Sequence, residues 1–301
     1  MRLSVALFLV CVALATAAPS LAEENRLTLP AGVKQIADIV YARVGGTELH
    51  MDINLPEKMP DKPLPVVVWI HGGGWKQGTY KWNRSAWFVK HGYAAASIQY
   101  RFIDEAIFPA QIHDCKAAIR FLRANASKYG IDPNRIGVWG GSAGGHLAAL
   151  LGTSGGVKEL ETNLDNSDQS SRVQAVCEWY GPNDLAMGIR EPEPGRKKPQ
   201  LLVQLLGATH EEKPEIYRLA SPISHVTKDD PPFLIVHGDA DDLVPVAQAE
   251  VFYVALRKAG VEAAFIKVRN GNHGLTAKDQ HPDLASIEKR MVEFFDRHLK
   301  G

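Results

Sequence analysis

The sequence predicts an α/β protein with a mostly parallel central sheet and helices on both faces. Short apolar runs typical of buried strands alternate with helix-length segments along most of the chain. Several of these runs are followed directly by glycine-rich or polar loops, and ligands bind at that edge of an open α/β sheet. The chain has 301 residues, and we expect a single domain over residues 23–301.

The elements follow in order from their local patterns. Apolar and polar residues alternate in 36–44 and 49–55, and Gly45-Gly46 between them favours a hairpin. After the hairpin, the apolar runs predict buried strands, and the longer segments between them predict helices. Strands are expected at 66–70, 94–100, 136–139, 173–179, 233–236 and 264–268, and helices at 109–129, directly after Ser142, at 246–259 and at 286–299.

The first residues have the pattern of a secretory signal. Arg2 precedes an apolar core over 3–18, and small residues end this segment at Ala22. We expect a signal peptide over 1–22, cleaved after Ala22, and a secreted or periplasmic protein. A membrane anchor is the alternative, but the apolar stretch is short for a span and breaks at Pro19.

Two segments interrupt the alternation of strands and helices. Residues 153–172 are polar and predict a surface loop. Residues 184–207 contain a stretch too rich in proline and charge for a core element. An insertion there would lie above the carboxyl ends of the strands, so 184–207 is a candidate lid. A solvated loop with no role is an equally good interpretation.

Ser142 lies at the centre of Gly140-Gly141-Ser142-Ala143-Gly144, between an expected strand and an expected helix. A strand, a sharp turn and a helix with serine at the apex form the nucleophile elbow. Glycines two positions either side are needed because a Cβ there would collide with the crossing strand and helix. The pattern predicts that Ser142 is a nucleophile.

The run His71-Gly72-Gly73-Gly74-Trp75 follows the apolar strand 66–70. Backbone N–H groups in a glycine-rich loop can point into a cavity without interference from side chains, and two such donors make an oxyanion hole. We assign the donors to Gly73 and Ala143, with Gly72 or Gly74 as the neighbour that could substitute. The alternative is a tight turn that only needs positive φ.

The apolar strand 233–236 leads into a loop with three carboxylates, Asp239, Asp241 and Asp242. One of the three is expected to reach a catalytic imidazole. The other two are expected to be solvated or to cap the following helix, because aspartate is a preferred N-cap residue.

The chain has eleven histidines. Of these, His273 follows the acidic loop and is flanked by glycines in Asn270-Gly271-Asn272-His273-Gly274. This gives the order serine, aspartate, histidine expected for an elbow serine, and it predicts His273 as the general base. An ordinary loop histidine is the alternative.

These residues together predict acyl transfer through an acyl-enzyme. His273 takes the proton of Ser142, the acid holds the imidazole, and water completes the cycle. This chemistry requires no metal and no organic cofactor, and the sequence has no His-Glu-x-x-His pattern. Formal net charge is zero and no basic stripe occurs, which argues against a nucleic-acid or anionic-membrane partner. Nothing in the sequence specifies an oligomeric state.

Two cysteines follow the predicted signal peptide. Cys115 falls in an expected helix and Cys177 in an expected buried strand. An oxidising compartment would permit a disulfide between them, but two buried thiols are at least as good an interpretation.

The chain resembles the α/β-hydrolases identified as bifunctional feruloyl and acetyl-xylan esterases, relatives of carboxylesterases and hormone-sensitive lipases. The resemblance implies the α/β-hydrolase fold and a serine esterase. It also selects Asp241 as the acid, since similar hydrolases place it four residues after the histidine of the His-Gly pair. Gly141 departs from the acidic residue usual in hormone-sensitive-lipase relatives. The resemblance rests on 71–75, 99–101, 109–111, 114–117, 131–136, 142–148, 180–182, Asp184, Ser221-Pro222, the Asp241 loop and His273-Gly274.

The resemblance implies short-chain acyl, acetyl or feruloyl esters as substrates, including small-molecule esters and esters of plant polysaccharides. Trp75, Trp179 and Tyr180 are candidate pocket residues, because aromatic faces can stack on sugar rings or a feruloyl group, although they are equally good core residues. The alternatives are a generalist short-chain carboxylesterase, a peptidase or amidase, a lipase with a long acyl groove, and a non-catalytic binding scaffold.

Overall fold

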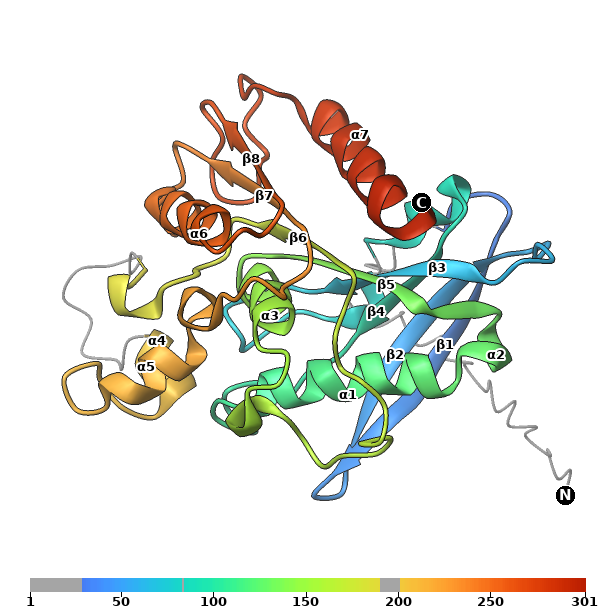
Figure 1. The fold of residues 1–301 in the computed structure, drawn as a ribbon, viewed down its shortest axis with the longest axis horizontal. Helices are drawn as coiled ribbons and strands as arrows, with labels where there is room; N and C mark the ends of the chain where they lie inside the picture. The colour runs from blue at the N-terminus through green and yellow to red at the C-terminus, as the bar shows by residue number, and fades with distance from the viewer. Residues whose placement is uncertain (1–28, 83, 190–200) are drawn as a thin grey trace, which may run out of the picture.

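The computed structural model describes residues 29–82, 84–189 and 201–301. The expected signal peptide and residues 190–200 of the candidate lid lie outside this part of the chain. Helices flank a central eight-stranded sheet in the order β1-β2-β4-β3-β5-β6-β7-β8 (Figure 1). This architecture confirms the predicted α/β-hydrolase fold.

The strands match the apolar runs and extend several of them, but β4 ends and β6 begins two residues inside the predicted ranges 94–100 and 173–179. β1 and β2 pair antiparallel, as do β2 and β4, and all the following pairs are parallel. The strand bounds are β1 Val33–Val44, β2 Thr47–Pro56, β3 Leu64–Ile70, β4 Ala94–Ile98, β5 Ile131–Gly141, β6 Ala175–Trp179, β7 Phe233–Gly238 and β8 Ala263–Val268.

The β1–β2 hairpin forms around the predicted glycine pair. Gly45 and Gly46 have φ of 56° and 89°, and a two-residue turn of type I′ requires positive φ at both positions. Glycine adopts such angles without steric cost, so this pair fixes the loop.

The helices match the predicted segments with two differences. The segment expected as one helix over 109–129 divides at Asn125 into α1 and α2. Two short helices, α4 and α5, lie in a region where no helix was expected, and α4 forms the carboxyl-terminal part of the candidate lid. The helix bounds are α1 Ala110–Ala124, α2 Ala126–Tyr129, α3 Ala143–Thr153, α4 Leu201–Leu206, α5 Pro214–Ala220, α6 Ala247–Lys258 and α7 Leu284–Phe295.

The two faces of the sheet carry separate apolar cores. Alternate residues of one strand enter different cores, as with Ile235 and Val236 of β7. Residues of α1, α3 and α6 pack in the first core and those of α7 in the second. In Figure 1, α7 accordingly lies on the opposite side of the sheet from α1 and α3.

The two cysteines lie in different cores and do not form a disulfide. Cys115 packs in the first core and Cys177 in the second, and both are buried free thiols. Burial raises the pKa of both thiols, so they are unreactive apolar side chains.

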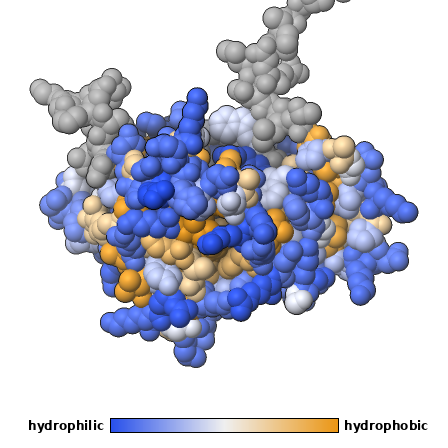
Figure 2. Space-filling model, turned by 90° about the horizontal axis from the view of Figure 1, so that it is seen from above, coloured by the Kyte–Doolittle hydropathy of each residue, from blue (hydrophilic) through white to orange (hydrophobic). Residues whose placement is uncertain are grey.

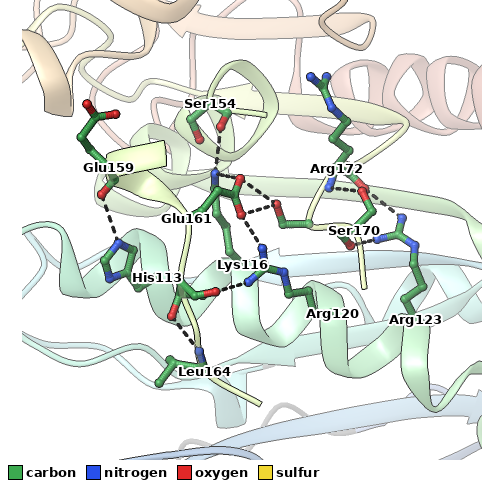
Figure 3. A network of polar contacts seen from close by, with 12 residues as sticks. His113, Lys116, Arg120, Arg123, Ser154, Glu159, Glu161, Leu164, Ser170 and Arg172 are labelled. Carbon is green, nitrogen blue, oxygen red and sulfur yellow. Dashed lines mark hydrogen bonds and ion pairs between the residues drawn. The ribbon is translucent and has the colours of Figure 1, made fainter. Parts of the chain in front are cut away.

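The polar loop that follows α3 is tied to α1 by a buried ion-pair network (Figure 3). Lys116 is completely buried; it donates to the backbone oxygen of Ser154 at 2.8 Å and to Glu161 Oε1 at 2.7 Å. Arg120 binds the second oxygen, Oε2, of Glu161 at 2.5 Å. Glu161 therefore forms ion pairs with two cations of α1 and fixes the loop on which it lies.

Replacing Glu161 with glutamine is expected to lower the free energy of unfolding by about 2 kcal/mol. Removing one partner of a buried pair leaves an uncompensated charge, which costs about 3–5 kcal/mol for full burial. Glu161 is 26% exposed, so the expected cost is smaller. Urea denaturation checks this, with Glu159→Gln as the control because the Glu159 side chain is exposed. Equal midpoints for the two variants would contradict the role given to Glu161.

Figure 2 shows one face of the molecule, where hydrophilic residues predominate and apolar atoms appear in patches between them. Within 29–82, 84–189 and 201–301, every helix is too short or too polar to cross a membrane.

Candidate active site

Ser142 lies at a strained turn between β5 and α3. Its backbone has φ 58° and ψ −123°, outside the regions that residues with a side chain normally adopt. A Cβ on Gly140 would lie 2.3 Å from the backbone oxygen of Gly144, and one on Gly144 would lie 2.0 Å from that of Ile70. Both glycines are therefore required sterically, as the elbow pattern predicts.

The structure brings the three predicted catalytic residues into one hydrogen-bonded line. His273 Nε2 lies 2.9 Å from Ser142 Oγ, and His273 Nδ1 lies 2.7 Å from Asp241 Oδ2. The carboxylate can only accept, so Nδ1 carries the hydrogen and Nε2 is free to accept the hydroxyl proton. The serine, base and acid come from β5–α3, the loop after β8 and the loop after β7.

Asp241 is the one carboxylate of its loop that points inward. Its Oδ1 accepts the backbone N–H groups of Leu243 and Val244 at 2.9 and 2.8 Å. Burial alone would raise the pKa of Asp241, but hydrogen bonds from His237 and His273 outweigh burial and hold the pKa well below its usual range. Asp241 is therefore ionised at neutral pH.

The other two carboxylates of the loop are exposed. Asp239 Oδ1 accepts the backbone N–H of Asn270 at 2.7 Å, which links the acid loop to the loop that carries His273. Neither Asp239 nor Asp242 makes a hydrogen bond to His273 within the described residues, and neither caps α6, whose N-cap residue is Val246.

The glycine-rich loop after β3 lies directly against the serine. A Cβ on Gly72 would approach Ser142 Cβ to 3.4 Å. Gly73 has φ 111°, and a Cβ there would lie 2.1 Å from the backbone oxygen of Gln77, so Gly73 is the turn residue. Ala143 is the first residue of α3, so its N–H has no acceptor within the helix. The arrangement suits an oxyanion site between Gly73 and Ala143.

A cavity of about 500 Å³ opens at Ser142 and His273. Trp69, Trp82 and Tyr180 are the large aromatic residues that line it. Among the described lining residues, Arg84 carries a permanent positive charge. The remaining lining residues are Gly72, Gly73, Gln77, Gly78, Thr79, Gly141 and Gly274.

Of the three aromatic residues predicted for the pocket, Tyr180 lines the cavity. Its ring contacts that of His273 edge to face, with centroids 5.0 Å apart, and a Cβ on Gly141 would lie 2.8 Å from its hydroxyl. Tyr180 has φ 40°, which is uncommon for an aromatic residue, and such strain is concentrated at functional sites.

Trp75 does not line the cavity. It is 2% exposed, and its Nε1–H donates to Nδ1 of His146 at 3.2 Å. His146 Nε2 in turn donates to the backbone oxygen of Ala220 at 2.7 Å, and burial lowers the pKa of His146 to about 4. Trp75 therefore binds a neutral histidine beneath the oxyanion loop instead of meeting substrate.

Trp179 is also outside the cavity lining and packs in the second core. The rings of Trp69 and Trp139 lie 4.2 Å apart and those of Trp139 and Trp179 lie 5.2 Å apart. These residues come from the adjacent strands β3, β5 and β6, and they point toward the second core. The result is a row of aromatic rings that supports Tyr180.

Sequence reasoning did not assign Trp69, Gln77 or Arg84 to the pocket. Trp82 lies in the aromatic-rich segment after the oxyanion loop and is 40% exposed. Trp69 belongs to a strand whose sequence predicts burial at every position, so no local pattern distinguishes Trp69 from core residues. Its alternation with Val68 and Ile70 is the signal that places it on the other face.

The sequence of the chain matches a known protein family and several curated proteins. The BD-FAE family model matches residues 51–256. Esterase LipQ of Mycobacterium tuberculosis is 34% identical over 264 residues, which cover 86% of this chain and 60% of LipQ. Esterase LipC of the same organism is 35% identical over 233 residues, covering 76% of this chain and 57% of LipC. The chain thus spans about three fifths of the length of these curated relatives.

Solved structures show the same fold. A truncated carbohydrate esterase from gut microbiota superposes with a TM-score of 0.78 at 33% identity, covering 92% of this chain and 99% of that one. A bifunctional GH43-CE protein of Bacteroides eggerthii gives 0.76 at 36% identity, covering 88% and 38%. Butyrate-bound esterase Est2 of Thermogutta terrifontis gives 0.70 at 27% identity, covering 89% and 93%.

Proposed function

The chain belongs to the BD-FAE family of α/β-hydrolases, and we propose that it is a serine carboxylic-ester hydrolase that works through an acyl-enzyme. The observation that carries this proposal is the hydrogen-bonded line from Ser142 through His273 to Asp241. The curated relatives named as esterases and the carbohydrate-esterase structure support the reaction class.

The reaction follows from the positions of these atoms. His273 Nε2 takes the proton of the Ser142 hydroxyl as Oγ attacks the ester carbonyl carbon. The imidazolium that forms is stabilised by the ionised Asp241 at 2.7 Å. His273 then protonates the leaving alcohol, and a water molecule repeats the sequence to release the acid and restore Ser142.

The oxyanion of the tetrahedral intermediate is assigned to the backbone N–H groups of Gly73 and Ala143, with Gly72 beside them. Each donor in such a site contributes about 3–4 kcal/mol to transition-state stabilisation. The helix that begins at Ala143 adds the positive end of its dipole at the same point.

For the substrate, we propose short-chain acyl, acetyl or feruloyl esters, including those carried by plant polysaccharides. The cavity of about 500 Å³ has room for a feruloyl group, and Trp82 and Tyr180 offer aromatic faces to it. The resemblance to the carbohydrate esterase from gut microbiota favours ester groups on sugars. The expected signal peptide agrees with action outside the cytoplasm, and secretion or periplasmic location is part of the proposal.

Covalent labelling tests the proposed nucleophile. An organophosphonate ester should add to Ser142 in a one-to-one ratio, with the modified peptide identified by mass spectrometry. Ser142→Ala should give no adduct. Stable labelling at another residue, or none under conditions where the protein is folded, would exclude the acyl-enzyme mechanism.

Replacing Trp82 with alanine is expected to raise KM for methyl ferulate about five-fold and to leave KM for p-nitrophenyl acetate nearly unchanged. An aromatic contact contributes about 0.5–1.5 kcal/mol, and the acetyl group is too small to make it. Steady-state kinetics on both esters checks this.

Trp87 provides the control, because it packs against Phe88 and His91 and does not line the cavity. Equal changes for both substrates in Trp82→Ala would argue that Trp82 acts on the fold of the loop and not on the feruloyl ring.

A further inference from the structure

The cavity at Ser142 carries a permanent positive charge on one of its walls. Arg84 lines this cavity, and the described lining residues include no aspartate and no glutamate. His273 also lines the cavity, but it acts as the base in its neutral form. A cavity whose walls hold a cation and no acid favours a substrate that brings a negative charge of its own.

Arg84 is directed toward the cavity although its side chain is exposed. The guanidinium carbon lies 5.8 Å from the centroid of the Trp69 ring, which lines the same cavity, and a cation over an indole face is attracted to it. The next residue, Ser85, is buried, and its hydroxyl accepts Trp139 Nε1–H at 2.5 Å. The backbone beside Arg84 is therefore anchored to the second core.

Arg84 makes no ion pair within the ranges that the structure describes. Its charge acts on Glu288 of α7, but no ion pair joins these two described side chains, and Glu288 does not line the cavity. Lys81 of the same segment differs, because its Nζ lies 3.5 Å from Asp38 Oδ1. A guanidinium has five N–H donors, so Arg84 keeps donors for a ligand.

Tyr180 supplies a second donor beside Arg84. The Arg84 guanidinium hydrogen bonds to the Tyr180 side chain. Because a guanidinium can only donate, the phenol oxygen accepts, and its own hydrogen is left for another acceptor. Burial raises the pKa of Tyr180, against the opposing charge of Arg84, so the hydroxyl stays protonated at neutral pH. A Cβ on Gly141 would lie 2.8 Å from this hydroxyl, which places the donor beside the residue before Ser142.

The structure holds the Tyr180 ring in place before any ligand binds. Tyr180 is 5% exposed, and its backbone N–H donates to the Val236 oxygen at 2.8 Å. Its ring packs against those of His273 and Trp179, with centroids 5.0 and 6.2 Å away. A donor fixed in this way loses little conformational freedom when a ligand binds.

We propose that Arg84 and Tyr180 form an anion-binding pair, so that the preferred substrates are esters that carry a free carboxylate near the scissile bond. A planar guanidinium can bind both oxygens of a carboxylate, and the tyrosine O–H can donate to one of them. The inference rests on the proposed function and narrows its substrate class. The carboxylate has two possible sources: an acidic sugar on the alcohol side of the ester, or a dicarboxylic acid on the acyl side.

Two matched pairs of esters test the preference and distinguish the two sources. Mono-p-nitrophenyl glutarate and its neutral amide, p-nitrophenyl glutaramate, test the acyl side; p-acetoxybenzoate and p-acetoxybenzamide test the alcohol side. In at least one pair, KM should be about tenfold lower for the anionic ester, the effect of one hydrogen bond to a charged group. Within that pair kcat should differ little, because the carboxylate is bound equally in the ground and transition states.

Substitutions then assign the preference to its donors. Arg84→Gln removes the charge and should bring the two KM values of that pair to within about twofold, whereas Tyr180→Phe removes one hydroxyl donor and should lower the KM ratio about threefold. A general loss of activity affects both esters and cancels in the ratio. Lys81→Gln is the matched control, because Lys81 is a cation of the same segment outside the cavity lining, and it should keep the wild-type ratio.

The wild-type protein provides a test that needs no variant. Because Arg84 is exposed, added salt should screen its charge and reduce the preference for the anionic ester. KM measured for both esters at low and high sodium chloride checks this. A preference that is independent of salt would contradict the role given to Arg84.

Equal KM values within both pairs in the wild type would overturn the proposal. So would a folded Arg84→Gln variant that keeps the preference, or an equal loss of preference in Lys81→Gln, because general electrostatics would then explain the effect. The Ser142→Ala blank and organophosphonate labelling separate the two levels of inference. If Ser142 labels and the esters of each pair react alike, anion binding fails alone; if Ser142 does not label and none of these esters is hydrolysed, the proposed function fails.

Discussion

Replacing Ser142 with alanine is expected to lower kcat for ester hydrolysis by roughly 10⁵- to 10⁶-fold, the largest effect of any substitution in this protein. Removing the nucleophile of a comparable triad costs about that much, and the activity left over water comes from the oxyanion site and binding. The Ser142 hydroxyl hydrogen bonds to His273 and to no other described residue, so its loss should disturb the structure little.

The measurement is kcat and KM on p-nitrophenyl acetate, with thermal unfolding recorded in parallel. Thr79→Ala is a suitable control, since Thr79 places another hydroxyl residue in the same cavity. Retention of more than a tenth of wild-type kcat by Ser142→Ala would mean that another group performs the attack.

Asp241→Asn is expected to lower kcat about 10⁴-fold, the second largest effect. Asparagine keeps the shape of the side chain but can present its amide to His273 Nδ1, which favours the wrong tautomer. Asp239→Asn should change kcat less than tenfold, because an asparagine oxygen can still accept the Asn270 N–H that Asp239 accepts at 2.7 Å.

The comparison identifies the acid because both changes remove one carboxylate from the same loop, and thermal unfolding of each variant separates loss of activity from loss of stability. Single-turnover kinetics with a chromogenic acetate gives the acylation rate for each variant. A greater loss in Asp239→Asn than in Asp241→Asn would show that the acid has been assigned to the wrong residue.

The sequence predicts Ser142 from a short motif with its own steric requirement, whereas Asp241 was selected from three carboxylates of one loop by the resemblance. Gly140 and Gly144 surround Ser142 since no Cβ fits there, and that requirement is visible in five consecutive residues. The same reasoning reaches Gly73, whose φ of 111° demands glycine.

The residues that line the cavity could not be predicted from short motifs. Trp75 and Trp179 lie close in sequence to the oxyanion loop and to Tyr180, but closeness along the chain does not say where a side chain points. Trp179 turns toward the second core because strand residues alternate, and Trp69 reaches the cavity from a strand that reads as fully buried.

The most direct test of the account is the hydrolysis of a panel of esters and one anilide by the protein, with Ser142→Ala as the blank. The panel contains p-nitrophenyl acetate through decanoate, methyl ferulate, acetylated xylan and a p-nitroanilide. We expect serine-dependent turnover of acetyl and feruloyl esters and little of decanoate or the anilide. Turnover that peaks on simple short-chain esters alone would indicate a generalist carboxylesterase, and preference for the anilide an amidase. Absence of serine-dependent turnover on every ester would contradict the central claim and leave a binding scaffold with an intact triad.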